Sequence, residues 1–126
     1  MHPKERDRLS RMRQALSELV QEIEELIPVF AARDPMVKGT VYEQRRTCGK
    51  PTCGCASGPL HGTMILSRSK EGRTKLISIA SEQVEELRVL TGQYQRFRRA
   101  RARLGQIHRK MLSLIDKLEA ARRREP

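Results

Sequence analysis

The sequence predicts an α+β protein with an N-terminal heptad helix, a small three-stranded antiparallel sheet bearing a Cys/His loop, and a long basic C-terminal helix. Apolar residues recur at alternating spacings of three and four in the first and last thirds, which is typical of coiled-coil helices. The middle third is rich in β-formers, and its Gly- and Pro-rich stretch holds all three cysteines. We expect segments 1–37, 38–80 and 81–126 to form one compact unit.

The N-terminal helix is predicted from an unbroken apolar seam. Its members are Leu9, Met12, Leu16, Leu19, Ile23, Leu26 and Phe30. Pro28 lacks a backbone N–H and removes one helical hydrogen bond, so we expect it to end or kink the helix just before it.

Three strands are predicted in the middle third. The stretches "GTVYEQRR", "TMILSRS" and "RTKLISIA" contain the β-formers, and "KEG" joins the last two, with Gly72 suited to positive φ. The Cys/His loop falls between the first strand and this hairpin. The prediction is therefore a small antiparallel sheet.

The C-terminal helix is expected to start at Ser81 as N-cap, with acidic residues in its first turns and "ARRRE" at its end. Its predicted seam contains Leu87, Leu90, Tyr94, Phe97, Arg101, Leu104, His108, Met111, Ile115, Leu118 and Arg122. Arg101 and His108 are interpreted as polar residues that fix helix register. Gly92 and Gly105 each cost about 1 kcal/mol relative to Ala, so we expect this helix to bend.

Self-association is predicted from helix lengths. A helix from Ser81 to Arg123 spans roughly 60 Å, whereas residues 4–27 span roughly 35 Å. The shorter helix leaves part of the longer seam uncovered, which favours a homodimer. The chain has 126 residues and no Trp. Its charged N-terminus and the absence of a long apolar run predict a soluble, cytoplasmic protein without a membrane partner.

The cysteine-rich stretch, "CGKPTCGCASGPLHG", predicts a structural Zn²⁺ site. Cys48, Cys53, Cys55 and His61 supply the four sulfur and nitrogen ligands that tetrahedral zinc prefers. With four protein ligands no position is left for a reactive water. A metal-free thiol loop, an iron–sulfur or redox centre, and a catalytic cysteine remain as alternatives.

The net charge of +11 predicts a polyanionic partner, most often DNA or RNA. The expected contact residues are Arg45, Arg46, Lys50, Arg68, Arg73, Lys75, Arg96, Arg98, Arg99, Arg101, Arg103, Arg109 and Lys110. Lys70 is expected among the basic residues that surround the Cys/His loop. Two alternatives stay open: the charge is only a solvated surface, or the helix arginines pair with Glu18, Glu22 and Glu25.

The stretch from residue 38 to about 112 resembles a family of small uncharacterised prokaryotic proteins, a domain of unknown function. The resemblance rests on a strand running into CGKxxCxC, a Gly-His-Gly element, a hairpin, and a helix with the pattern VEELR…YxxFR. The matching residues are Cys48, Gly49, Lys50, Cys53, Cys55, His61, Gly62, Tyr94 and Phe97. This resemblance implies no activity.

Taken together, these features predict a non-enzymatic, zinc-stapled nucleic-acid-binding protein that forms a homodimer. The alternative is a coiled-coil adaptor that binds a protein partner and uses zinc only to stabilise its fold. An enzyme is the third and least favoured hypothesis, because no paired carboxylates, phosphate loop or catalytic triad occurs in the sequence.

Overall fold

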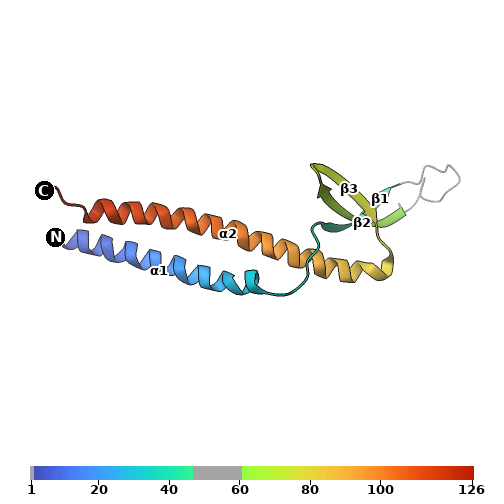
Figure 1. Ribbon diagram of the computed structural model, residues 1–126, viewed down its shortest axis with the longest axis horizontal. Coiled ribbons are helices and arrows are strands. Elements are labelled where there is room, and N and C mark those ends of the chain that lie inside the picture. Colours follow the sequence, from blue (N-terminus) through green and yellow to red (C-terminus); the bar gives the residue numbers. More distant parts are fainter. Residues whose placement is uncertain (1, 47–60) are drawn as a thin grey trace. The chain divides into compact units, whose positions relative to one another are not determined.

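The computed structural model describes residues 2–46 and 61–126, apart from the side chains of Arg46 and His61 (Figure 1). The elements are α1 (Pro3–Ala31), β1 (Thr40–Arg46), β2 (His61–Lys70), β3 (Arg73–Ser78), the 3-10 turn η2 (Ser81–Gln83) and α2 (Val84–Arg122). The predicted α+β class and the order of helix, three strands and helix are confirmed.

The chain forms two compact units. Unit 1 consists of residues 1–33 and 97–126, and unit 2 of residues 34–96. The division follows from the length of α2, which has 39 residues against 29 in α1. At 1.5 Å per residue α2 is about 15 Å longer. Its first turns therefore belong with the sheet, and only its later part pairs with α1.

Helix α1 begins with a capping box around His2. The His2 Nδ1 accepts a hydrogen bond from the Lys4 backbone N–H at 3.1 Å, and the Glu5 carboxylate accepts one from the His2 backbone N–H at 3.1 Å. The expected end before Pro28 is wrong, because the helix continues to Ala31. Proline removes a single hydrogen bond near the helix end, and Phe30, beyond it, packs in unit 1.

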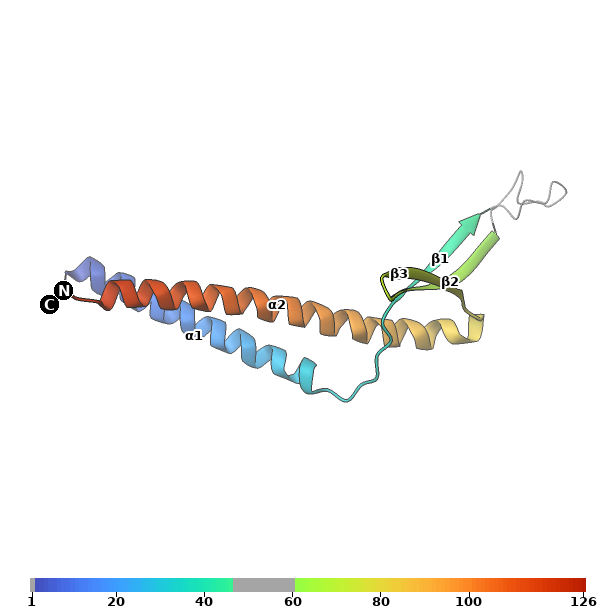
Figure 2. The ribbon, with the colours of Figure 1, turned by 45° about the horizontal axis from the view of Figure 1, so that its top comes forward.

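In unit 1, α1 and the later part of α2 pack as an antiparallel pair of helices (Figures 1 and 2). We call this pair the helical hairpin, although unit 2 lies between its two helices in the sequence. The predicted seam of α1 is confirmed, since every member is buried or half-buried. Phe30 meets Phe97 edge to face, with ring centroids 5.5 Å apart. The most buried side chains of the hairpin are Met12, Ala100 and Ile107. These buried side chains and the aromatic contact pack the later part of α2 against α1.

Beyond Phe97 the predicted seam of α2 is confirmed at Leu104, Met111 and Leu118 and is wrong at Arg101, His108, Ile115 and Arg122, which are exposed. The buried and half-buried apolar side chains from Phe97 onward are those of Phe97, Ala100, Leu104, Ile107, Met111, Leu114 and Leu118, and Arg103 is half-buried beside them. Arg101 and His108 are exposed, so they do not fix the register of this hairpin, and Ile115 is exposed as well. Every member of the observed seam is apolar, whereas the predicted seam has three polar members beyond Phe97, namely Arg101, His108 and Arg122, so the observed seam buries more apolar surface.

The sheet has the order β1-β2-β3, with both pairs antiparallel. Glu71 and Gly72 form a two-residue turn between β2 and β3 with φ of 54° and 77°, and positive φ at both positions is characteristic of a type I′ turn. Ile65 and Leu66 in β2 are both buried. Because adjacent strand residues point to opposite faces, both faces of the central strand are covered at this level.

Helix α2 starts at Val84 rather than at Ser81. Ala80 precedes the 3-10 turn and makes no side-chain capping bond. The first turns of α2 are tied into unit 2, where the Val37 N–H donates to the Leu90 carbonyl at 3.0 Å. Leu87, Leu90 and Tyr94 of the predicted α2 seam are half-buried within one chain. The difference in helix length therefore no longer argues for a homodimer, which stays a prediction. No helix among the described residues is long and apolar enough to cross a membrane.

Candidate functional site

Four basic side chains gather at the turn end of the β2–β3 hairpin. Arg68 lies opposite Lys75, and Lys70 lies opposite Arg73. Opposed residues, and residues two apart in one strand, point to the same side of a sheet. Arg68, Lys70, Arg73 and Lys75 therefore share one face, and we call them the hairpin cations.

The hairpin cations are accessible and carry no acidic partner in the described part of the chain. Arg68 is half-buried and the other three are exposed. Arg45 occupies the same face, because it lies opposite Gly62 in the β1–β2 pair. Its guanidinium is engaged by Glu43, with 3.0 Å between Nε and Oε1. The charge of this face is therefore concentrated at the hairpin turn.

This arrangement opposes the stability of the hairpin. Like charges directly opposite each other destabilise a sheet, and here both pairs beside the turn are alike. Two unit charges about 5 Å apart repel by roughly 0.8 kcal/mol in water. A bound anion between the cations would remove this repulsion.

The cations of α2 are dispersed rather than gathered. Arg96, Arg98, Arg99, Arg101, Arg109 and Lys110 are exposed, and Arg103 is half-buried. At 100° per residue, Arg98 and Arg109 lie opposite the seam, whereas Arg99 and Lys110 flank it on one side and Arg101 on the other. A single phosphate backbone cannot contact all of them at once.

Arg103 is committed to an intramolecular ion pair with Glu22 of α1. Its Nη2 donates to both carboxylate oxygens at 2.6 Å, and its Nε donates to Oε1 at 3.0 Å. For this residue, the alternative of pairing with the acidic side chains of the first helix is confirmed. The hydrogen bonds and the charge of Arg103, together with the charge of Lys110, hold the pKa of Glu22 below its ordinary value of 4.5.

The lowered pKa predicts a pH-dependent contribution of Glu22 to stability. A carboxylate with a depressed folded-state pKa stabilises the fold above its unfolded-state pKa, and this contribution is lost as pH falls through the folded-state value. We expect Glu22→Gln to be less stable than the native chain at neutral pH, with the difference shrinking below pH 4.5. Urea unfolding followed by circular dichroism at several pH values measures this, and a difference independent of pH would contradict it.

Most of the predicted metal site lies outside the described residues. This applies to Cys48, Cys53 and Cys55, and also to Lys50. His61 is the first residue of β2 and pairs through its backbone with Arg46, the last residue of β1. Within residues 2–46 and 62–126, no three His, Cys, Asp or Glu side chains gather as metal ligands would.

Comparison with known families identifies the family of this chain. The model of a domain of unknown function, DUF6788, matches residues 8–89, which is well over half of the chain. The chain belongs to the DUF6788 family. The predicted resemblance to an uncharacterised family is thereby confirmed, and the match also includes most of α1. No curated protein and no solved structure matches the chain.

The hairpin cations lie inside the DUF6788 match, whereas Arg96 and the later cations of α2 lie beyond it. Sequence reasoning named three of the four as contact residues and missed that all four share one face. The signal was present in "RSKEGRTK", because a two-residue turn at Glu71 and Gly72 fixes the pairing of the residues around it.

Proposed function

We propose that this protein binds nucleic acid, without catalysing a reaction, by placing the hairpin cations against the phosphate backbone. The observation that carries the proposal is the pair of directly opposed like charges on one face, Arg68 with Lys75 and Lys70 with Arg73. Their positions cover about 5 Å across the strands and about 7 Å along them. Such a patch suits successive phosphates better than one small anion.

A competing explanation is protection of the sheet edge. Strand β3 is an edge strand, and natural proteins place Lys and other charges on edge strands to prevent pairing with another sheet. This explanation requires charge on β3 but not on the central strand β2. Arg68 and Lys70 lie on β2, so edge protection accounts for only half of the patch.

The proposal includes a structural Zn²⁺ held by Cys48, Cys53, Cys55 and His61. It is supported by the ligand types and their number. The antiparallel pairing of β1 with β2 adds support, because it brings both ends of the intervening segment to one end of the ladder. Bound zinc would fix this segment against the sheet. The arginines of α2 would add weaker, less directed attraction for phosphate.

The test compares two variants with the same change in net charge. In one, Arg68, Lys70, Arg73 and Lys75 are changed to Gln. In the other, Arg96, Arg98, Arg101 and Arg109 of α2 are changed to Gln. Fluorescence anisotropy measures binding to labelled duplex DNA, single-stranded DNA and RNA over a range of salt concentrations, using protein of known zinc content.

We expect the hairpin variant to lose most of its affinity. For duplex DNA, its slope of log K against log salt should become shallower by up to about 3.6, since each neutralised phosphate contributes about 0.9. The α2 variant should keep most of its affinity and most of its salt slope. Equal losses in the two variants would reduce the binding to a general effect of charge, and no binding by the native chain would reject the proposal.

A protein-binding adaptor is the second candidate function. It is favoured by large apolar side chains on the outside of the helical hairpin, namely Val20, Ile27, Leu112 and Ile115, which are between 42% and 52% exposed. An adaptor would bind nucleic acid weakly and lose that binding equally in both Gln variants. The comparison above therefore also distinguishes these two functions.

A further inference from the structure

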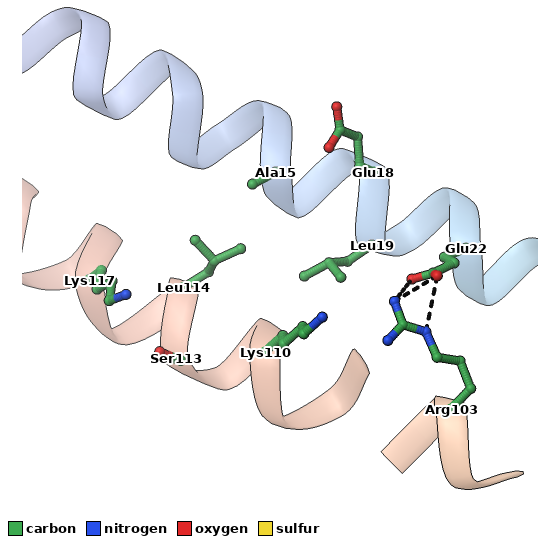
Figure 3. A pocket seen from close by; sticks show the side chains of 9 residues that line it. All are labelled: Ala15, Glu18, Leu19, Glu22, Arg103, Lys110, Ser113, Leu114 and Lys117. Atoms are coloured by element: carbon green, nitrogen blue, oxygen red, sulfur yellow. Dashed lines mark hydrogen bonds and ion pairs between the residues drawn. The ribbon is translucent and has the colours of Figure 1, made fainter. Parts of the chain in front are cut away.

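The two helices of unit 1 enclose a groove along one side of their seam (Figure 3). It has a volume of about 530 Å³. Its apolar lining comes from Ala15, Leu19 and Leu114, all half-buried, so the hairpin alone leaves this surface partly in contact with water. The groove lies on the side of the Glu22–Arg103 pair, which closes one end of it.

The two walls of the groove carry opposite charge. Glu18 and Glu22 stand on the α1 wall, and Arg103, Lys110 and Lys117 stand on the α2 wall. Glu22 and Arg103 neutralise each other. In the described part of the chain, no acid pairs with either lysine, and Glu18 accepts a hydrogen bond only from Gln14, at 3.3 Å. The groove thus presents one acidic and one basic edge on either side of an apolar floor.

We propose that the occupant of this groove is a second copy of the same chain, related by a two-fold axis parallel to the helices. Rotation about such an axis exchanges the two sides of the groove, so the α1 wall of each copy faces the α2 wall of the other. A partner of a single charge sign would meet one repelling wall. A second copy carries both signs in the complementary order, and its association buries the apolar floors of both grooves.

The positions of Glu18 and Lys110 fit this arrangement. Glu18 lies four residues from Glu22, and Lys110 lies seven residues from Arg103, in the same direction along the antiparallel hairpin. At 1.5 Å per residue the two side chains are within about 5 Å of the same level. The two-fold axis therefore brings Glu18 of each copy beside Lys110 of the other. The resulting assembly is a bundle of four helices in which neighbouring helices are antiparallel.

This inference does not depend on nucleic-acid binding, and charge reversal tests it. Lys110→Glu places an acidic side chain on both walls at this level, and Glu18→Lys places a basic one on both, so each variant repels its own copies at two symmetric contacts. We expect the dissociation constant of each variant's dimer to rise by about tenfold. An equimolar mixture should form a heterodimer of native affinity, because the acidic walls of one variant then face the basic walls of the other.

Analytical ultracentrifugation over a wide range of concentrations measures these affinities. The double variant Glu18→Lys, Lys110→Glu should dimerise like the native chain. Circular dichroism melting serves as the control for folding, and both positions are exposed, so the melting temperatures should stay close to the native value. A monomeric native chain, variants that dimerise as well as it does, or a mixture without recovery would each overturn the proposal.

Discussion

Gly39→Ala is expected to destabilise unit 2 by about 2 to 4 kcal/mol, from backbone strain and overpacking together. Gly39 precedes β1 with φ of 150°, which side-chain-bearing residues rarely adopt. A Cβ atom there would lie 2.8 Å from the Ser67 carbonyl oxygen and 2.9 Å from Leu66 Cδ1. The first is a backbone atom and the second belongs to a buried side chain, so neither can move without disturbing the sheet.

Gly92→Ala is the matched control, because it makes the same chemical change in the same unit. Gly92 lies in α2, and apart from its chain neighbours and the adjacent helix backbone, no atom lies within 4 Å of the position of its added Cβ. We expect this change to stabilise the protein by up to about 1 kcal/mol, since Ala has the higher helix propensity. Amide hydrogen exchange in β1 and β2 measures both effects locally. Equal protection in Gly39→Ala and the native chain would refute the assigned role of Gly39.

Ile107→Ala is the second large expected effect, a loss of about 2 to 5 kcal/mol from unit 1. Ile107 is fully buried between the helices of the hairpin, with 0% of its surface exposed. Truncation to Ala removes three carbon atoms from this packing and leaves a cavity that the helices fill only in part. The free energy of unfolding, obtained from urea titration followed by helix circular dichroism, reports the loss.

Ile115→Ala tests the phase of the seam on the same helix. Ile115 is 46% exposed, so its truncation should change stability by less than about 1 kcal/mol. The seam expected from the sequence contains Ile115 and omits Ile107. A larger loss at Ile115 than at Ile107 would therefore restore the expected seam and contradict the observed one.

The strands, the hairpin turn and the seam of α1 were predictable because local signals agree with one another. The phase of the α2 seam was not predictable from spacing alone, because two seams share Phe97, Leu104, Met111 and Leu118 and differ only in their other members. From Phe97 the next member is either Ala100 or Arg101, depending on whether the spacing of three or four comes first. An apolar criterion selects Ala100, which places Arg103 beside the seam, on the side where it meets Glu22.

Other features depend on contacts that lie far apart in the sequence. The continuation of α1 beyond Pro28 is accompanied by the contact of Phe30 with Phe97, and the start of α2 after Ser81 follows a 3-10 turn. Propensity alone favours the earlier helix end and the earlier start. The common face of the hairpin cations depends on register, which becomes predictable only once the two-residue turn is recognised.

The insertion of unit 2 between the two segments of unit 1 sets an order for folding. During synthesis α1 emerges first, and it can pair with α2 only after the strands of the sheet and α2 itself have been synthesised. The Val37–Leu90 hydrogen bond joins positions close to the two ends of the inserted segment. Once unit 2 has folded, the loop that must close to bring Phe30 to Phe97 is short, and its entropic cost falls accordingly. Folding of unit 2 therefore lowers the entropic cost of pairing the two helices of unit 1.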